Sequence, residues 1–303
     1  MLDIHSDDIV VDATLGGAGH AQEIVKLLGP KGMFIGFDRD ADAIQRGKDA
    51  LIDTNVPVHL IEGNFRDLQK ELEKVGIQKI TKALFDLGWS SYQLDSGRGF
   101  SHQADEPLMM TFSKGGGPVT AAIAVNTWAE ESLADIMYGF GEERYSRRIA
   151  RAIVERRERK PFTTARELAE VIVEAVPVSY RHGRIHPATR TFQALRIAVN
   201  DELGALKQGL ESAFETLEEG GRIAVITFHS IEDRAVKQLF AGFEKAGKGK
   251  KLTKKPVAPS REEVRENRRA RSAKLRVFEK ISTPYEKVTK NKQIQTLDTS
   301  GEI

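Results

Sequence analysis

A glycine-rich segment, Asp12-Ala-Thr-Leu-Gly-Gly-Ala-Gly-His20, separates a short apolar run from an amphipathic one. Glycines at such a turn allow the backbone to approach a ligand and to enter the next helix sharply. The next apolar run ends in Gly-Phe-Asp38-Arg-Asp, and a carboxylate at that position can accept hydrogen bonds from both hydroxyl groups of a ribose. Together the two segments predict a site for a cofactor that contains adenosine.

The spacing of the glycines distinguishes two classes of cofactor. Dinucleotide sites use the pattern G-x-G-x-x-G, which places a pyrophosphate on a helix N-terminus. Counted from Gly17, the position of the third glycine is occupied by Gln22. S-adenosylmethionine has no phosphate and requires only the close turn and the ribose carboxylate, so the sequence favours this cofactor. An NAD(P)-dependent oxidoreductase stays open as an alternative, although no His or Lys stands out as its proton donor.

A third polar segment, Phe-Asp86-Leu-Gly-Trp-Ser-Ser-Tyr-Gln-Leu-Asp95, follows a later apolar run. In a parallel sheet its start would lie beside the cofactor turn, where a methyl acceptor binds. The carboxylate of Asp86 and nearby carbonyl groups can accept the protons of an amine, and an aromatic ring can stack on a base. The other interpretation is that Asp86 only caps a turn.

The elements that must position these segments are visible as an alternation of apolar and amphipathic runs. Strands are predicted at 9–11, 33–37, 58–61, 83–85, 222–228 and 275–281, and helices at 20–28, 40–52, 68–75, 203–217 and 232–245. Gly220-Gly221 is predicted to stop the helix before it, and 248–259 to form a loop. This alternation predicts a doubly wound parallel sheet with helices on both faces.

The middle of the chain lacks strand signals. Two capping boxes, Thr127–Glu130 and Thr164–Glu167, predict helix starts, and a basic helix is predicted over 142–159 between them. We therefore expect an inserted helical domain at 106–197 that recognises the substrate. The sheet domain would be discontinuous, formed by 1–105 and 198–281, and 282–303 would form a flexible tail.

Composition restricts the function further. The chain has 303 residues, of which 40 % are hydrophobic and 30 % charged, as in a globular protein. No apolar run reaches the roughly 20 residues of a membrane helix and no secretory signal is visible, which predicts a cytoplasmic protein without a membrane partner. The absence of cysteine excludes disulfides and thiolate metal sites, and the seven His are scattered, so no metal is expected. Residues 245–303 carry a net charge of +10 against −8 for the rest, which favours a polyanionic partner.

Longer motifs carry a family resemblance between Val10 and Ile281. They are DATLGGAGHA, GFDRD, LFDLGWSSYQLDSGRGFS, GFGEERYSRRIARAIVERR, HPATRTFQALRIAVNDEL, ITFHSIEDR and ENRRARSAKLRVFEKI, in this order. Together they resemble the small-subunit ribosomal RNA (cytosine-N4) methyltransferase family, RsmH or MraW. The resemblance implies an α/β protein of class I, an S-adenosylmethionine-dependent methyltransferase with a Rossmann-like sheet and an inserted helical domain. It also implies methylation of the exocyclic amine of a decoding-centre cytidine, with an assembling small subunit as the partner.

The resemblance also implies a set of cofactor contacts. They correspond to Ala18, Gly19, His20, Asp38, Phe65, Asp86 and Gln93. Residue type and spacing alone already indicate the glycine turn, Asp38 and Asp86, and they make Asp86 the candidate catalytic residue as well. They do not indicate Phe65, whose type and position also fit ordinary core packing.

The chain departs from the family pattern in three places. The usual N-terminal segment with an H-x-P-V-L motif is missing, which predicts a less covered cofactor pocket or a truncated start. The family's PLDMRMD reads PLMMTFS at 107–113, without the Asp and Arg expected near the acceptor. Trp89 and Tyr92 replace Val and Pro and would add stacking surface. The altered 107–113 segment leaves a non-catalytic RNA-binding protein of ribosome assembly as a second alternative.

Cationic side chains outside the glycine turn are candidates for RNA contacts. The basic helix and the acid-free segment 177–200 supply arginines, and two further candidates follow the strand at 222–228. The predicted RNA-binding residues are Arg144, Arg148, Arg190, Arg196, His229 and Arg234. The competing interpretation is that these arginines form salt bridges at the domain junction and that His229 and Arg234 stabilise a turn.

Overall fold

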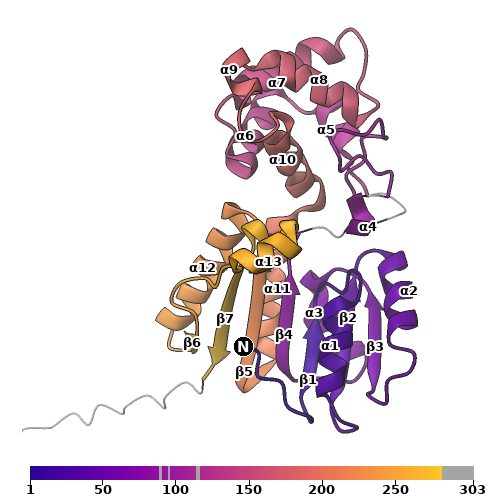
Figure 1. Ribbon diagram of the computed structural model, residues 1–303, viewed down its shortest axis with the longest axis vertical. Helices are drawn as coiled ribbons and strands as arrows, with labels where there is room; N and C mark the ends of the chain where they lie inside the picture. The colour runs from indigo at the N-terminus through magenta and orange to yellow at the C-terminus, as the bar shows by residue number, and fades with distance from the viewer. Residues whose placement is uncertain (89–90, 95, 114–116, 282–303) are drawn as a thin grey trace, which may run out of the picture.

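The computed structural model describes residues 1–88, 91–94, 96–113 and 117–281 (Figure 1). The predicted tail and Trp89 lie outside these residues. Within them, no helix is both long enough and apolar enough to cross a membrane.

A seven-stranded sheet forms the lower part of the molecule in Figure 1. Its strands are β1 (Ile9–Asp12), β2 (Met33–Asp38), β3 (Val58–Glu62), β4 (Ile80–Asp86), β5 (Leu217–Thr227), β6 (Gly249–Lys251) and β7 (Lys274–Lys280). The order is β3-β2-β1-β4-β5-β7-β6; β7 runs antiparallel to β5 and β6, and the other described strand pairs are parallel. This arrangement confirms the class I methyltransferase fold. Because β1 is the first strand and its two neighbours are β2 and β4, the crevice for a ligand lies at its carboxyl end.

Helices cover both faces of the sheet. One face packs on α1 (Gly19–Leu27) and α2 (Ala41–Ala50), and the other on α3 (Leu68–Lys74), α11 (Glu202–Thr216) and α12 (Ser230–Lys245). Successive strand residues point to opposite faces, so Val10 belongs to the first core and Val11 to the second. Strands buried on both faces explain the continuous apolar runs from which they were predicted.

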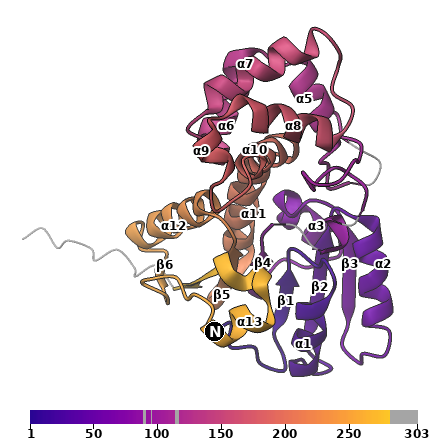
Figure 2. The same ribbon diagram turned by 45° about the horizontal axis from the view of Figure 1, so that its top comes forward.

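A helical cluster stands above the carboxyl end of the sheet (Figures 1 and 2). It contains α5 (Ala121–Thr127), α6 (Glu130–Gly141), α7 (Ser146–Arg157), α8 (Ala165–Ala175), α9 (Val178–Arg181) and α10 (Ala188–Asn200). These helices bury a hydrophobic core of their own, with Leu133, Ile153 and Leu168 inaccessible to solvent. Phe100 belongs to this core as well. The limits of the inserted helical domain, placed at 106 and 197 from the sequence, stay a prediction.

The connection from the helical cluster back to the sheet is short. α10 ends at Asn200 and α11 begins at Glu202, with Asp201 between them in the left-handed region at φ 48°. The short helix α4 (Ser91–Leu94) precedes the outgoing connection. The returning chain ends with α13 (Arg261–Glu266) and the 3₁₀ turn η2 (Arg268–Ser272), which Figure 1 shows at the upper edge of the sheet, below the helical cluster.

Three local predictions differ from the structure. Thr127 does not cap α6: it is the last residue of α5, where its hydroxyl donates to the Ile123 carbonyl at 2.7 Å, whereas the Thr164–Glu167 capping box is confirmed. α11 ends at Thr216, before the predicted glycine stop, and β5 begins at Leu217. The predicted loop at 248–259 contains β6, a short lysine-rich edge strand whose composition conceals its pairing with β7.

Candidate cofactor and acceptor site

Asp38 closes β2 and faces the glycine turn. Its Oδ2 accepts a hydrogen bond from the Gly16 N–H at 2.8 Å, and its Oδ1 accepts one from the Asp40 N–H at 2.9 Å. Both bonds come from backbone, so the carboxylate is held in one orientation, and each oxygen keeps a second lone pair for a ligand. Burial raises the pKa of Asp38. The structure thus fixes the glycine turn against the carboxylate that the sequence assigns to the ribose.

Asp12 ends β1 and is completely buried. Its Oδ1 accepts a hydrogen bond from the Thr14 N–H at 3.0 Å, while its Oδ2 has no hydrogen-bond partner in the described residues. Burial, and to a smaller extent the charges of Asp86 and Asp38, raise the pKa of Asp12 to about 6. An unpartnered buried oxygen is costly, so this position is suited to a bound donor or cation.

Asp86 ends β4, the strand on the other side of β1. Its backbone N–H donates to Thr14 Oγ1 at 2.7 Å, which ties the ends of the two strands together. Asp86 Oδ2 lies 3.4 Å from His20 Nε2, and this interaction raises the pKa of His20. Asp86 Oδ1 is buried and has no partner among the described residues. The sequence alone does not indicate a role for Thr14, because a threonine inside the glycine motif is inconspicuous without the fold.

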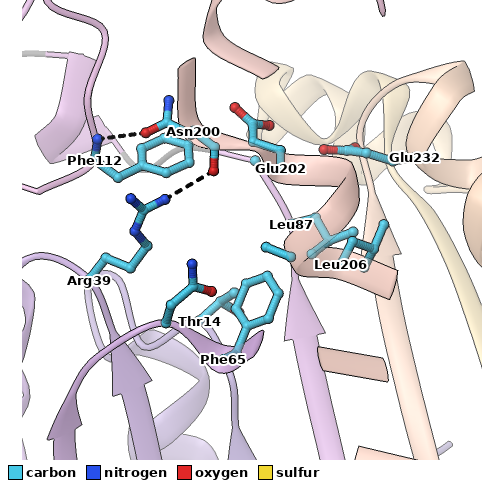
Figure 3. A pocket seen from close by; sticks show the side chains of 12 residues that line it. Thr14, Arg39, Phe65, Leu87, Phe112, Asn200, Glu202, Leu206 and Glu232 are labelled. Carbon is cyan, nitrogen blue, oxygen red and sulfur yellow. Dashed lines mark hydrogen bonds between the residues drawn. The ribbon is translucent and has the colours of Figure 1, made fainter. Parts of the chain in front are cut away.

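A small cavity of about 60 Å³ lies next to these carboxylates (Figure 3). Phe65, in the 3₁₀ turn η1 (Phe65–Asp67), forms one wall and packs edge-on against Phe85 with 5.5 Å between ring centroids. Thr14 and Arg39 also line it, and the Arg39 guanidinium donates to the Asn200 carbonyl at 3.4 Å. The ring of Phe65 is therefore exposed to the cavity and is available to a planar ligand.

The remaining predicted cofactor contacts surround the glycine turn. Ala18 is buried with φ 62°, in the left-handed region, and Gly19 begins α1. Gln93 lies in α4 with its side chain 9 % exposed. Tyr92 covers Gly17 so closely that a Cβ there would lie 3.1 Å from the ring, and the guanidinium of Arg46 stacks on Tyr92 at 4.1 Å. The structure thus brings these residues to one end of the sheet.

The segment that departs from the family pattern, 107–113, is held by its backbone. The Asn200 side chain donates to the Met110 carbonyl at 2.7 Å and accepts from the Phe112 N–H at 3.0 Å. Arg98 donates to the carbonyls of Thr111 and Phe112 and pairs with Asp40 at 2.8 Å. None of these bonds to the segment uses a side chain of the segment itself, while the side chains of Leu108 and Met110 are buried in the core of the helical cluster.

A much larger cavity of about 830 Å³ lies between the carboxyl end of the sheet and the helical cluster. Its walls come from five parts of the chain, namely the glycine turn, residues 88–110, α10, the end of β5 and η2. The lining residues with rings or charges are Tyr92, Phe100, His102, Phe192, Arg196, Phe228, His229, Arg268, Arg269 and Arg271. Among the described residues that line it, none is acidic.

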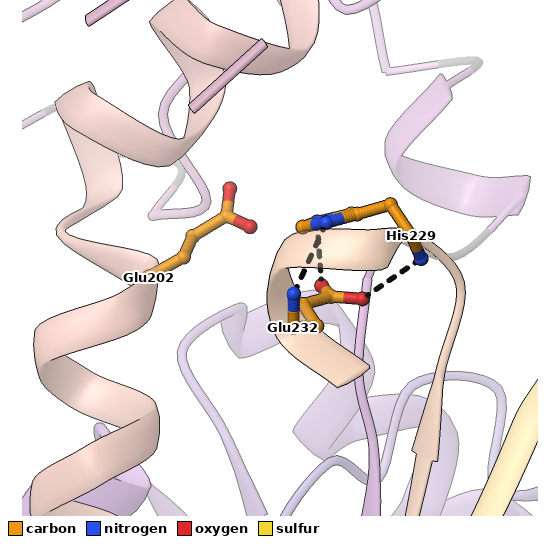
Figure 4. A group of neighbouring side chains, drawn as sticks. All are labelled: Glu202, His229 and Glu232. Atoms are coloured by element: carbon orange, nitrogen blue, oxygen red, sulfur yellow. Dashed lines mark hydrogen bonds and ion pairs between the residues drawn. The ribbon is translucent and has the colours of Figure 1, made fainter. Parts of the chain in front are cut away.

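One buried network joins the two cavities. Arg196 of α10 forms two hydrogen bonds with the Glu202 carboxylate, at 2.8 and 2.9 Å. Glu202, His229 and Glu232 lie together with ligand atoms within 4.8 Å of one another (Figure 4). His229 Nδ1 accepts from the Glu232 N–H at 3.3 Å, so the proton of a neutral ring resides on Nε2, 3.0 Å from Glu232 Oε1.

The ionisation of this network follows from its burial and its charges. Burial raises the pKa of Glu202, against the effect of Arg196. Burial also acts to raise the pKa of Glu232, but the hydrogen bond and charge of His229 outweigh it and lower that pKa. Three such ligand atoms match the donor set of a cation site, yet both oxygens of Glu202 are already engaged by a guanidinium. The arrangement is that of an ion-pair network at the junction.

Comparison with known proteins decides the family. The family model described as the MraW methylase family matches residues 1–281. The chain belongs to this family. It is 45 % identical over 296 residues to ribosomal RNA small subunit methyltransferase H of Clostridioides difficile, covering 92 % of this chain and 95 % of that one. It is 47 % identical over 300 residues to the protein of the same name from Carboxydothermus hydrogenoformans, covering 93 % and 94 %.

A solved structure of an rRNA methylase from Streptococcus thermophilus is similar at a TM-score of 0.43 and 13 % identity. That match covers 92 % of this chain and 89 % of the other.

In this family member, five of the six predicted RNA-binding residues already have partners, since His229 pairs with Glu232 at 3.0 Å. Arg196 pairs with Glu202, and Arg234 pairs with Glu142 at 2.8 Å. Arg190 donates to the Glu142 carbonyl at 3.2 Å, and the guanidinium of Arg144 stacks on Tyr145. His229 also lines the large cavity, and the sixth candidate, Arg148, is exposed on α7. RNA contacts by all six stay a prediction.

Proposed function

We propose that this protein methylates the N4 exocyclic amine of a decoding-centre cytidine in small-subunit rRNA. The protein belongs to the MraW methylase family and is 45–47 % identical to small-subunit rRNA methyltransferases. It is therefore a methyltransferase that uses S-adenosylmethionine and acts on small-subunit rRNA. The observation that supports the finer proposal is the position of Asp86. Its Oδ1 is buried without a partner among the described residues, at the end of β4 and two positions before Gly88, which lines both cavities.

The residues present fit S-adenosylmethionine. Asp38 offers two oriented oxygens for the ribose hydroxyls, and Phe65 offers a ring face for the adenine. The buried oxygens of Asp12 and Asp86 that lack partners suit a ligand with cationic or N–H groups, which this cofactor supplies. When bound, the cofactor provides an electrophilic methyl group on a sulfonium. The glycine turn leaves room for it, because a Cβ at Gly19 would meet nothing within 4 Å.

Asp86 is suited to activate an aromatic amine. The lone pair of a cytosine amine is delocalised into its ring, which makes the amine a poor nucleophile. A carboxylate oxygen that accepts one of its N–H hydrogen bonds localises the lone pair and stabilises the positive charge that develops on nitrogen. Asp86 Oδ2 is oriented by His20, which leaves Oδ1 for the amine. Orientation of the amine in line with the methyl group supplies the rest of the rate enhancement.

The large cavity is suited to hold the acceptor base. A cytidine in folded rRNA must leave its stack before its amine can reach Asp86. The rings of Tyr92, Phe100 and Phe228 line the cavity and offer stacking surfaces for a displaced base. The protein would therefore meet an assembling small subunit in the cytoplasm, where the target is still accessible.

A methyl-transfer assay tests this proposal. Small-subunit particles isolated from cells that lack the modification are incubated with the protein and labelled S-adenosylmethionine, and the nucleosides are then analysed by mass spectrometry. We expect N4-methylated cytidine at one position of the decoding centre. Label on a carbon atom or on another base would overturn the N4 assignment. Cofactor binding without any transfer would favour the non-catalytic alternative, while family membership already disfavours the oxidoreductase.

A further inference from the structure

The basic C-terminal part of the chain reaches the large cavity at η2. This 3₁₀ turn has the sequence Arg-Arg-Ala-Arg-Ser, and Arg268, Arg269 and Arg271 all line the cavity. The preceding helix α13 is different, because it carries three glutamates against two arginines. Positive charge is thus concentrated in the one part of this segment that borders the acceptor cavity.

The backbone of η2 is fixed. The Asn267 side chain accepts a hydrogen bond from the Arg269 N–H at 3.1 Å, and Ala270 is buried beneath the turn. β7 follows two residues after η2 and is anchored by Arg276, which forms two hydrogen bonds with Asp233 at 2.7 and 3.2 Å. Side chains that project from such a turn lose less conformational entropy on binding than those of a mobile tail.

The charges of two of these arginines are not neutralised within the chain. In the part of the chain that the structure describes, Arg268 and Arg271 form no ion pair or hydrogen bond through their side chains, and both are exposed. Arg196, on the opposite side of the cavity, is paired with Glu202. Since no described lining residue is acidic, the η2 wall carries an excess of positive charge, which favours an anionic ligand.

The wall that belongs to the helical cluster has the opposite character. Phe100 and Phe192 are buried there, and His102 stacks on His186 with 4.2 Å between ring centroids. His102 Nδ1 is buried without a hydrogen-bond partner in the described residues. Burial lowers the pKa of both histidines, so these rings are uncharged near neutral pH, and the charge of Arg196 on the same wall is balanced by Glu202. A cationic wall facing an aromatic one is the arrangement that holds a nucleotide, with phosphate on one side and base on the other.

We propose that Arg268 and Arg271 bind the backbone phosphates of the RNA on either side of the target nucleotide. They act as positioning residues, since they hold the strand at the cavity while the base enters. The inference rests on the proposed function, because it takes RNA as the substrate. The RNA contacts predicted from the sequence on α7 and α10 stay predictions. The proposal adds phosphate-binding residues on η2, which lies outside both helices.

The experiment compares three double variants of the full chain with the wild type. Arg268→Ala with Arg271→Ala removes the proposed contacts, and Arg268→Lys with Arg271→Lys keeps the charges. Arg261→Ala with Arg265→Ala is the matched control, because it removes the same charge from α13, outside the cavity lining. For each protein, kcat and KM for small-subunit particles are measured at several salt concentrations, and cofactor binding is measured by calorimetry.

For the cavity alanine variant we expect KM to rise on the order of tenfold with kcat nearly unchanged. The reason is that phosphate contacts stabilise the bound substrate and the transition state equally. The slope of log KM against log salt should fall by up to about 0.7 for each arginine, the value for a single-stranded phosphate. The lysine variant should keep most of the wild-type slope, because phosphate binding requires charge more than fork geometry. The α13 control should match the wild type, and cofactor affinity should be the same in all four proteins.

Two results would overturn the inference. One is a KM and a salt slope in the cavity alanine variant equal to those of the α13 control. The other is an equal loss in the lysine variant, which would indicate a packing role. A failure of the proposed function is distinguishable, since the wild type itself would then transfer no methyl group to the particles.

Discussion

On the cofactor side of the site, Asp12, Asp38 and Asp86 end three adjacent strands, and backbone groups of the same loops orient them. On the acceptor side, the cavity is assembled from five distant parts of the chain and its unbalanced charge is positive. The difference matches the proposed ligands, since one side would receive a small cationic cofactor and the other a polyanion. Local sequence motifs can therefore specify the cofactor side, whereas the acceptor side is formed only when distant parts of the chain come together in the fold.

The largest expected effect concerns the Arg196–Glu202 pair, which joins the helical cluster to α11. Both side chains are nearly buried, at 9 % and 12 % exposure. Arg196→Ala leaves the Glu202 carboxylate beside that of Glu232 without its cation, and loss of one partner of a buried pair costs about 3–5 kcal/mol. We therefore expect the free energy of unfolding, measured in urea, to fall by that amount.

Arg196→Met combined with Glu202→Leu is the matched variant, because it removes both charges at similar volume. It should unfold within about 2 kcal/mol of the wild type. An unchanged stability of Arg196→Ala would show that Arg196 is available for RNA, as the sequence predicts, and not committed to the junction.

Substitutions of Asp86 and Asp38 distinguish a role in methyl transfer from a role in cofactor binding. Asp86→Asn keeps the shape but weakens the acceptor, so kcat at saturating cofactor should fall on the order of 100-fold. Asp38→Ala removes hydrogen bonds to a charged group, so the cofactor Kd should rise about tenfold or more while saturating cofactor restores the rate. Steady-state kinetics and calorimetry measure both. Full rescue of Asp86→Asn by cofactor would remove its catalytic role.

The local geometry of the proposed cofactor side could be predicted from the sequence for a physical reason. Asp38 and the glycine turn belong to short motifs in which a carboxylate bonds the backbone N–H two residues later, so the local sequence carries most of the geometry. The doubly wound sheet follows from apolar periodicity in the same way. Asp12 and Thr14 were missed, although they lie within the quoted motif, because their roles depend on contact with β4.

The acceptor side could not be predicted to the same depth. Glu202 and His229 are 27 positions apart in the sequence, and nothing local indicates that they meet. The arginine-rich motif at 268–271 was visible, but its place beside the cavity depends on β7 returning between β5 and β6. Conversely, Arg190 and Arg234 look like free cations in the sequence, and both bond to Glu142 in the fold.

A smaller effect is expected from the titration of Asp12. Its pKa is about 6 in the fold against 3.8 in the unfolded chain, so the folded state prefers the protonated form. The stabilising contribution is complete below pH 3.8 and is lost as the pH rises through 6. Linkage gives a loss of about 1 kcal/mol between pH 5 and pH 7. Urea unfolding at the two pH values checks this.

Asp12→Asn is the control for that titration, because it removes the titrating group and leaves His20 in place. The pKa of His20 is also raised, so His20 shifts stability in the same direction with pH. Because the charges of Asp12 and His20 also shift each other's pKa, the difference between the two proteins reports Asp12 together with its coupling to His20. An identical pH dependence in wild type and variant would contradict the raised pKa.

The smallest expected effect is that of Arg234, which distinguishes a junction contact from an RNA contact. Its guanidinium and the Glu142 carboxylate are 58 % and 44 % exposed and 2.8 Å apart, and Ser230 Oγ donates to the same carboxylate at 2.8 Å. Solvent screening limits such a pair to less than about 1 kcal/mol, so Arg234→Ala should lower the melting temperature only slightly. Because its charge is already balanced, the salt slope of RNA binding should match that of the wild type, in contrast to the Arg268 and Arg271 variant. A slope lowered by about 0.7 with unchanged stability would instead place Arg234 on the RNA and extend the cationic wall from η2 to α12.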